Sequence, residues 1–547
     1  MTIKYTKEQL NKFDKDLLIE LFLGMQGQME ELSRQTQALN DRMQLMMEQM
    51  VLFQKNRFGR SSEKMADPEQ IRFMEVDGII VFFNEAEAVC DLDAPEPDDL
   101  ELKAPKKKKQ PGKKAADIAG LTVKRIDHYL KEEELTAEFG ENGWKQLPDA
   151  ISRCYQFIPA SVVIEEHHIG VYSSKLDEHM IKAPHPRNLL HGSLVSPSLA
   201  AAVINGKYVN AVPLYRLEKE FERYGLAITR QNMANWMIRL GEEYLGTMYD
   251  YLHKLLYDYH VIQADETPVL VNKDGRPAGS QSYMWVYRSG FMYRDRQIIL
   301  YEYQKTRNAS HPREFLRDYT GICVTDGYQV YHTLEKERED LKIAGCWVHC
   351  RRRFNDALEV IPKAHRKESI LHLIMKQIQA IYREEGKLSD FSTEDRLMQR
   401  QLVVKPLVDA FFAYLKQNEP KIPKNGKIRE AFTYALNQES YLKVFLEDGD
   451  VPIDNNASER AIRGFCIGKK NWEMIDTVNG ANSSAIIYSI AETAKANNLK
   501  PFDYFEYLLT EIPKHVDDKN TDFLAELLPW SDMLPENIRK PQKASGK

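Results

Sequence analysis

The sequence predicts a multidomain α/β protein that starts with a coiled coil, and three observations support this prediction. The chain has 547 residues, a length that usually holds three or four domains. Its first 60 residues carry a heptad repeat of apolar side chains. From about residue 258 to about residue 354, apolar runs typical of strands alternate with helical segments, as in a mixed sheet covered by helices.

The N-terminal segment, residues 1–60, predicts a coiled coil. It contains no proline, and a lone helix with such an apolar seam would expose it to water, so we expect a homodimer or higher homo-oligomer. A helical hairpin packed on its own chain is the alternative. The seam consists of Leu18, Met25, Leu32, Leu39, Met46 and Phe53, with Phe22, Met29, Thr36, Met43 and Met50 each four residues later.

Residues 61–119 predict a charged flexible linker, because prolines and runs of like charge oppose a packed core. An acidic stretch precedes a basic run in this segment. The lysines of that run suit contacts with DNA phosphates, and a solvated linker is the alternative. The basic run contains Lys106, Lys107, Lys108 and Lys109.

The next segment, residues 120–190, is predicted to form a small β-rich module.

Residues 191–250 predict a helical region. One helix is expected from Pro213 to near Gly225, and Thr229 is a suitable N-cap for a second helix that ends at Leu240. Two short helices joined by a tight turn form a helix-turn-helix candidate. Such helix pairs are also common packing units, so a structural role stays open. The side chains expected to face a DNA groove are Arg230, Gln231 and Asn235.

Residues 251–354 predict the first part of a ribonuclease H-like core, because the expected element order is β-β-β-α-β-α-β-α. Residues 355–450 are amphipathic and predict an all-helical insert. Residues 451–512 predict the second part of the core, and 513–547 a C-terminal tail.

Three acids are candidates for one site. Asp265 and Asp326 are expected to end the first and fourth core strands, and Glu459 lies on a helix after the insert. Three carboxylates at one sheet edge would repel each other unless cations separate them, and oxygen ligands suit two Mg²⁺ or Mn²⁺ ions. Such ions support phosphoryl transfer. Most acids are solvated, however, and Glu459 has the spacing of a surface ion pair with Arg463.

Basic residues occur around the last of these acids and suit contacts with DNA phosphates. Trp472 is expected to stack on a DNA base or to belong to the core. Asp454 is expected to cap the helix of Glu459, with a role as a fourth acid as the alternative. The remaining DNA-binding candidates are His349, Arg351, Arg352, Arg460, Arg463, Lys469 and Lys470.

Several blocks in order resemble the large (C-type) transposase of the insertion sequence 66 family, within the DDE superfamily. They include "NRFGRSSEK", "QADETPVLV", "TDGYQVY", "AGCWVHCRRRF", "IDNNASERAIRGFCIGKKNW" and "LLPW". The resemblance implies a leucine-zipper N-terminus, a zinc-finger-like module and a DDE core with a helical insert. It also implies that Asp265, Asp326 and Glu459 are the catalytic acids.

The sequence departs from the family in the finger-like module. The two Cys-x-x-Cys pairs usual there are missing, and Cys154, His167, His168 and His179 lack the spacing of a structural zinc site. We therefore expect a degenerate module without zinc. Zinc is also not expected at Cys346, His349 and Cys350.

The resemblance implies a DDE transposase that cleaves and joins DNA at insertion-sequence ends with two divalent metal ions. A metal-dependent nuclease or domesticated transposase that cuts without joining is one alternative, and a non-catalytic DNA-bridging coiled-coil protein is another. Expected partners are double-stranded DNA, further copies of the chain and small accessory transposition proteins, with no membrane. The net charge of −6 opposes DNA binding only weakly, because charge is segregated along the chain. Six cysteines without framework spacing and no apolar leader predict a cytoplasmic, nucleoid-associated protein.

Overall fold

A computed structural model describes residues 187–277, 279–518 and 520–541, together with 161–173, 180–184 and short pieces within 74–81 and 131–140. The predicted coiled coil and Lys106, Lys107, Lys108 and Lys109 lie outside the described residues. The chain divides into two compact units, one of Met1–Met50 and Pro159–Lys540, the other of Val51–Ile158 and Pro541–Lys547. The described strands of the second unit are the antiparallel pair β1 (Met74–Val76) and β2 (Ile79–Val81).

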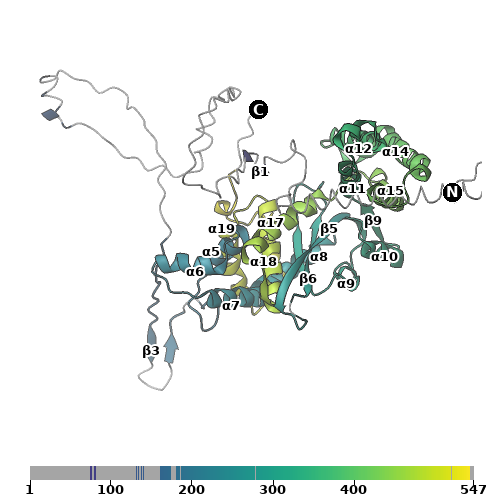
Figure 1. The fold of residues 1–547 in the computed structure, drawn as a ribbon. Coiled ribbons are helices and arrows are strands. Elements are labelled where there is room, and N and C mark those ends of the chain that lie inside the picture. Colours follow the sequence, from purple (N-terminus) through teal and green to yellow (C-terminus); the bar gives the residue numbers. More distant parts are fainter. Residues whose placement is uncertain are drawn as a thin grey trace, which may run out of the picture. The chain divides into compact units, whose positions relative to one another are not determined.

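The first unit is built around a mixed sheet with the strand order β7-β6-β5-β8-β9 (Figure 1). The pairs β5–β6 and β6–β7 are antiparallel, whereas β5–β8 and β8–β9 are parallel. A short strand, β10 (Ile475–Thr477), pairs in parallel with the far end of β5. The bounds are β5 Val261–Lys273, β6 Gln281–Ser289, β7 Ile299–Gln304, β8 Gly321–Thr325 and β9 Leu341–Gly345.

The predicted order of elements is confirmed over the first part of the core, where three helices separate or follow the last strands. They are α9 (Ser310–Phe315), α10 (Gln329–Glu337) and α11 (Trp347–Val360). The prediction that Asp265 ends its strand is wrong. Strand β5 continues to Lys273, because its antiparallel pairing with β6 extends to Leu270, opposite Gln281. Only the parallel pairing with β8 stops before Asp265, at Gln263.

The helices before and after the core share one hydrophobic cluster with the sheet. One of these helices, α18, also protects the edge strand β7, since Ser489 Oγ accepts the N–H of Tyr301 at 2.7 Å and Thr493 Oγ1 that of Ile299 at 2.9 Å. The helices in this layer are α5 Pro197–Ile204, α8 Gly246–Leu256, α17 Asn456–Trp472, α18 Val478–Ala496 and α19 Pro501–Glu511.

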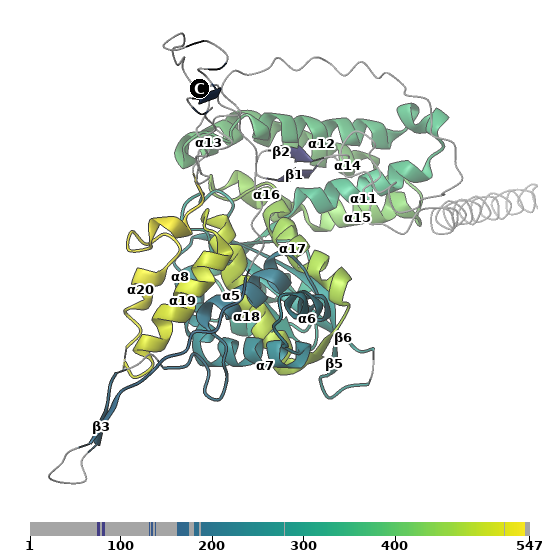
Figure 2. The ribbon, with the colours of Figure 1, turned by 90° about the vertical axis from the view of Figure 1, so that its left-hand side faces the viewer.

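A second hydrophobic cluster joins the sheet to the insert. Neighbouring residues of β8 point to opposite faces, so Ile322 and Val324 pack with the insert whereas Cys323 packs in the first cluster. Figure 2 shows α11, α12, α14 and α15 stacked beside one another above the other helices. The predicted insert is helical as expected, with α12 Ile370–Gly386, α13 Thr393–Gln399, α14 Lys405–Asn418, α15 Lys427–Asn437 and α16 Glu439–Lys443.

The predicted helix pair is present as α6 (Leu214–Arg223) and α7 (Arg230–Leu240). Gly225 supplies the left-handed turn between them with a φ of 80°. Thr229 caps α7, because its Oγ1 accepts the N–H of Asn232 at 3.2 Å. The candidate groove residues Arg230, Gln231 and Asn235 are all exposed.

Two further segments complete the first unit. Of the predicted β-rich module, the structure describes a hairpin of β3 (Val171–Ser173) and β4 (Met180–Lys182), whose apolar side chains are exposed. The segment predicted as a C-terminal tail contains α20 (Leu524–Leu527) and packs into the first cluster through Leu534 and Ile538 as far as it is described.

Candidate active site

Two of the predicted acids meet at the edge where the parallel pairing of β5 and β8 stops. Gln263 lies opposite Val324 in that pairing, and two residues further along each strand the chain reaches Asp265 and Asp326. Asp326 directly follows β8, and its Oδ1 accepts the N–H of Tyr328 at 2.9 Å. The backbone therefore places both carboxylates at one edge of the sheet.

Helix α17 brings Glu459 to the same edge. The residue before the helix, Asn455, is fully buried, and its Nδ2 donates to the carbonyl of Ala264 at 2.7 Å. Its Oδ1 accepts from Nε2 of buried Gln263 at 3.1 Å. These bonds attach the start of α17 to β5 immediately before Asp265.

Two side chains of the sheet hold the next turns of α17. Buried Arg288 of β6 donates from Nη1 to the carbonyl of Ala457 at 3.3 Å, and Tyr301 of β7 donates from its hydroxyl to that of Ala461 at 2.7 Å. Glu459 lies between Ala457 and Ala461 in α17, so hydrogen bonds before and after it in the sequence fix its position relative to the sheet.

Asp454 accepts hydrogen bonds at the start of α17, as expected for a capping residue, although the N-cap position itself is held by Asn455. Asp454 Oδ1 accepts the N–H of Asn456 at 3.1 Å and its Oδ2 accepts from the side-chain amide of Asn456 at 2.9 Å. Burial raises the pKa of Asp454, and the hydrogen bond from the Asn456 backbone opposes this shift.

Asp265 has no cation of the protein beside it among the described residues. Its Oδ1 accepts the N–H of Glu266 at 2.9 Å. Burial and then the negative charges of Glu266, Asp326 and Glu459 raise the pKa of Asp265 well above its usual range. The three candidate acids therefore form one electrostatic cluster, with Asp265 at its centre.

Glu459 lies beside the guanidinium of Arg352 and the imidazole of His349 on α11, and burial lowers the pKa of His349. Glu459 Oε2 lies 3.7 Å from Nη2 of Arg352 and its Oε1 3.9 Å from Nε2 of His349. Glu459 Oε1 is buried and accepts no hydrogen bond from any described residue. The surface pair with Arg463 is not found among the ion pairs of the described residues.

Sequence reasoning missed two residues of this site, Glu266 and Arg307. Arg307 lies in the loop after β7, and its Nε donates to Glu266 Oε1 at 2.6 Å. Its Nη2 lies 3.8 Å from Oδ2 of Asp326. Glu266 is adjacent to Asp265 in "QADET" and could have been noticed, but nothing in the sequence around Arg307 indicates this contact.

One group of potential metal ligands occurs among the described residues, namely Cys346, His349 and Glu459, whose ligand atoms lie within 4.8 Å of one another. Burial raises the pKa of Cys346 to about 12, and its sulfur accepts the N–H of Asn455 at 3.2 Å. A thiol that stays protonated is a poor zinc ligand. The carboxylates, with a buried unpartnered oxygen on Glu459, suit a hard divalent cation better.

Comparison with known proteins now places the chain. The model "Transposase IS66 family" matches residues 192–483, more than half of the chain and the whole region that carries the three acids. The chain belongs to this family. Membership implies a transposase, that is, a DNA-processing enzyme with DNA as its substrate.

Two further models match parts of this IS66 transposase family member. "IS66 C-terminal element" matches residues 489–530, which include α19 and α20. "Transposase C of IS166 homeodomain" matches residues 45–126, which overlap the segment predicted as a charged linker.

Three curated relatives come from Sinorhizobium fredii (strain NBRC 101917 / NGR234), and each is named as an uncharacterized protein. Protein y4qI is 28% identical over 66% of this chain and 67% of its own length. Protein y4jD is 24% identical over 76% of this chain and 82% of its own length. Protein y4hP is 22% identical over 72% of each chain.

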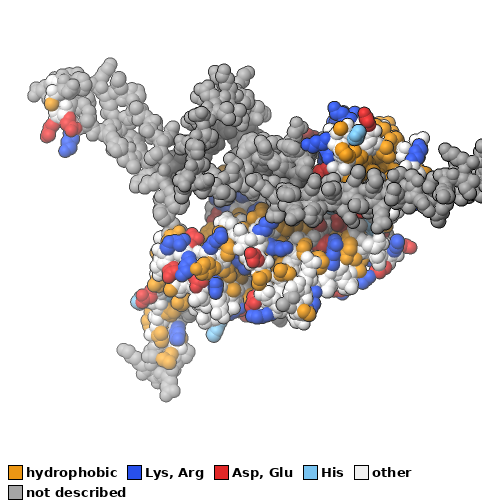
Figure 3. All heavy atoms as spheres, in the orientation of Figure 1, with side chains coloured by type: hydrophobic (Ala, Val, Ile, Leu, Met, Phe, Trp, Pro, Cys, Tyr) orange, Lys and Arg blue, Asp and Glu red, His pale blue; other side chains and the backbone are white. Residues whose placement is uncertain are grey.

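The basic residues predicted to contact DNA near the acids lie on α11 and α17 of this IS66 family protein. Arg352, Arg460, Arg463 and Lys470 are exposed, whereas Arg351 and His349 are partly buried. Lys469 donates from Nζ to the carbonyl of Pro268 at 2.6 Å. On the face in Figure 3, Lys and Arg gather on the visible part of the insert, whereas both signs of charge are interspersed over the core.

Trp472 ends α17 and packs on Phe465, with the ring centres 5.6 Å apart, against the first hydrophobic cluster. This position favours the core role over stacking on a DNA base. Among the described residues, no helix combines the length and the apolar character needed to cross a bilayer.

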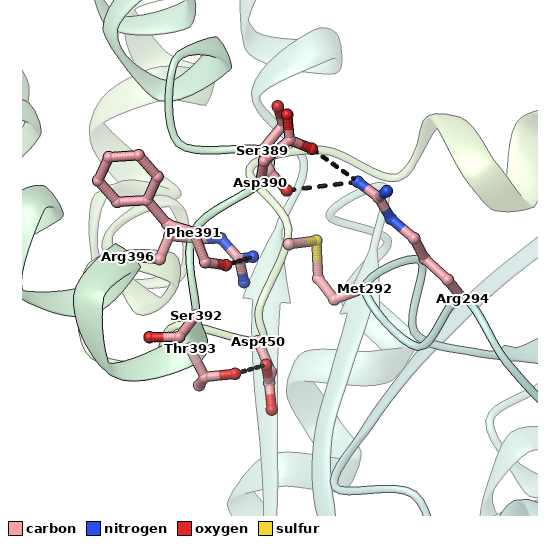
Figure 4. Close-up of a pocket in the computed structure, with 9 residues that line it drawn as sticks. All are labelled: Met292, Arg294, Ser389, Asp390, Phe391, Ser392, Thr393, Arg396 and Asp450. Carbon is pink, nitrogen blue, oxygen red and sulfur yellow. Dashed lines mark hydrogen bonds and ion pairs between the residues drawn. The ribbon is translucent and has the colours of Figure 1, made fainter. Parts of the chain in front are cut away.

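A separate pocket lies between the β6–β7 loop and the insert (Figure 4). Arg294 from the loop donates to Asp390 Oδ1 at 3.3 Å, and Thr393 donates to Asp450 Oδ1 at 2.6 Å. None of the three candidate acids lines this pocket. The contact between Arg294 and Asp390 connects the loop to the insert, and the pocket is distinct from the acid cluster.

Proposed function

We propose that this transposase is a DDE enzyme that cleaves DNA at insertion-sequence ends and joins the ends to target DNA. The observation that carries the proposal is the cluster of Asp265, Asp326 and Glu459, which three separate elements bring to one sheet edge. The mixed sheet, with three antiparallel strands followed by two parallel ones and a helical insert before α17, supports a ribonuclease H-like core.

The donor set fits divalent metal ions. Three carboxylates offer hard oxygen ligands, and Glu459 Oε1 is buried without a hydrogen-bond partner among the described residues. Burial, and then repulsion from the neighbouring acids, raises the pKa of Asp265. We propose that Asp265, Asp326 and Glu459 hold two Mg²⁺ or Mn²⁺ ions. Such ions, when bound, stabilise the charge that develops on oxygen during phosphoryl transfer.

The protein's own cations orient the DNA. Arg352 lies beside Glu459, and Arg460 and Arg463 extend the basic surface along the exposed side of α17. His349 also lies beside Glu459, but burial lowers its pKa, so it offers a neutral hydrogen-bonding group and not a cation. We propose that these residues bind phosphates on either side of the reacting bond and that α7 contacts DNA further away. The coiled coil and the lysines at 106–109 complete this proposal as the oligomerisation segment and a further phosphate contact, in a cytoplasmic, nucleoid-associated enzyme.

A strand-transfer assay with element-end DNA and Mg²⁺ tests the proposal. We expect the full chain to produce both cleaved and joined DNA, and Asp326→Ala to produce neither. Asp340→Asn, which changes an exposed aspartate between β8 and β9, is the matched control and should keep full activity. Cleavage without joined product would favour a nuclease, and full activity of Asp326→Ala would reject the acid site.

A further inference from the structure

Arg307 occupies the other side of the acid cluster and has no assigned role. Four contacts fix its guanidinium. Nε donates to Glu266 Oε1 at 2.6 Å, and Nη2 donates to the same oxygen. Nη2 also lies 3.8 Å from Asp326 Oδ2, and the group lies 3.7 Å above the ring of Tyr328. The hydroxyl of Tyr328 also donates to the backbone carbonyl of Arg307 at 2.8 Å. Both ends of this arginine are therefore held by Tyr328.

The two partners of the Glu266–Arg307 ion pair differ strongly in exposure. The Glu266 side chain is 2% exposed, whereas that of Arg307 is 38% exposed. A buried carboxylate thus holds a cation whose outer part faces solvent. Arg307 Nη1 donates no hydrogen bond to any described residue, so one corner of the fork is directed to neither Glu266 nor Asp326.

We propose that Arg307 binds a phosphodiester group of the DNA substrate next to Asp326. This inference rests on the proposed function and adds a substrate contact to it. A guanidinium suits this role because it donates to phosphate oxygens in a fixed planar arrangement, and stacking on Tyr328 reduces the freedom lost on binding. Glu266 acts as the positioning residue, since it orients Arg307 from the buried side.

The competing explanation is that Arg307 only neutralises Glu266 and Asp326. The two roles differ in what removal of the cation does. Loss of a phosphate contact weakens DNA binding and lowers its dependence on salt, because fewer counterions are released. Loss of a neutralising charge changes protein stability or divalent-ion affinity and leaves the salt dependence of DNA binding unchanged.

The test measures the affinity of the full chain for an element-end duplex over a range of salt concentrations, at pH 8 and in Ca²⁺, which also prefers oxygen ligands. For Arg307→Gln we expect about tenfold weaker binding. The slope of log affinity against log salt should shrink by about 0.9. Arg307→Lys should weaken binding but keep the slope, and Glu266→Gln should also weaken binding.

Arg313→Gln is the matched control. Arg313 is exposed to a similar extent and pairs with Glu337 on α10, away from the acids, so its loss should change neither affinity nor slope. Unchanged affinity and slope in Arg307→Gln would overturn the proposal. If that variant does not fold, wild-type affinity in Arg307→Lys would overturn it instead. These measurements of DNA binding need no cleavage. They are therefore independent of the strand-transfer assay, in which full activity of Asp326→Ala would reject the proposed acid site.

Discussion

The two faces of strand β5 each carry a buried carboxylate, and the charges beside these two carboxylates differ. Asp265 and Glu266 are neighbours in sequence and point to opposite faces. Burial and the neighbouring acids raise the pKa of Asp265, which has no cation of the protein beside it among the described residues. Burial and Asp326 also raise the pKa of Glu266, to about 7, but Glu266 is paired with Arg307, which opposes this rise. Where the protein leaves its acids uncompensated, we propose that a cation from solution binds. Where it supplies an arginine, the acid orients that arginine.

A third buried acid provides the reference for this comparison. Glu302 of β7 lies on the same face as Glu266, with Trp285 between them in the pairing of the strands. Its Oε1 accepts from Gln304 at 2.8 Å, and its buried Oε2 has no partner among the described residues. Burial raises the pKa of Glu302 to about 7. Glu302 is thus a buried acid that lies outside the acid cluster and pairs with no arginine among the described residues.

The largest effect is expected for Asp265→Asn, which removes the central charge of the cluster. Cleavage of element-end DNA should fall by roughly 10³-fold, because bound metal ions contribute several kcal/mol to phosphoryl transfer. Gel assays of strand cleavage measure this. Glu302→Gln is the control and should cleave at the wild-type rate, and a similar loss in both variants would contradict a special role for Asp265.

The next effect concerns stability and pH. An acid whose folded-state pKa is raised binds more protons when folded, so its contribution to stability decreases as pH rises from about 4.5 to about 7. Glu302→Gln removes this penalty and should stabilise the fold by roughly 3 kcal/mol at pH 8 and by little at pH 4. Denaturant unfolding at the two pH values measures the difference, and an equal gain at both would show that ionisation is not the cause.

Asn455→Ala should have an intermediate effect on the Asp265 face. The change removes the bond to Ala264 and the bond from Gln263 to Asn455 Oδ1. The start of α17 is then attached to Gln263 only through the carbonyl of Asp454, at 3.3 Å. Residues that orient metal ligands typically contribute 10- to 100-fold, and we expect losses of about that size in cleavage and in Mn²⁺ affinity. At the next position, the side chain of Asn456 donates to Asp454 and not to β5, so Asn456→Ala is the control. Equal values for both variants would contradict the positioning role.

The smallest effect is expected for Arg352→Gln. Arg352 is exposed and lies 3.7 Å from Glu459, so its loss removes one phosphate contact and one competing charge. DNA affinity should fall by up to about fivefold, the size of an exposed ion pair. Mn²⁺ affinity should not fall, because the acids remain. A decrease in Mn²⁺ affinity, measured by calorimetry, would place Arg352 among the groups that support the acids.

The order of elements and the edge position of the acids could be predicted from the sequence, because strand and helix patterns are local. Thr229 as the cap of α7 and the turn before Glu459 are local signals of the same kind. The assumption that Asp265 ends its strand failed for a local reason too. Residues after Asp265 keep an alternating pattern, and pairing with β6 extends the strand.

The contacts that complete the site could not be predicted, because they join residues far apart in the chain. Arg307 reaches Glu266 across 41 positions, and Asn455 reaches Gln263 across 192. Neither residue stands out by spacing or by its neighbours. The core position of Trp472 likewise depends on the packing of α17 against the rest of the first cluster.

Binding of Mn²⁺ to the full chain tests most directly how the Asp265 face of the sheet differs from the opposite face, which carries Glu266 and Glu302. Calorimetry on the wild type, Asp265→Asn and Glu302→Gln compares an acid of the cluster with a buried acid outside it. We expect Mn²⁺ to bind the wild type and Glu302→Gln equally well and to bind Asp265→Asn at least tenfold more weakly. Equal Mn²⁺ affinity of Asp265→Asn and the wild type would contradict the assignment of the acid cluster as the metal site.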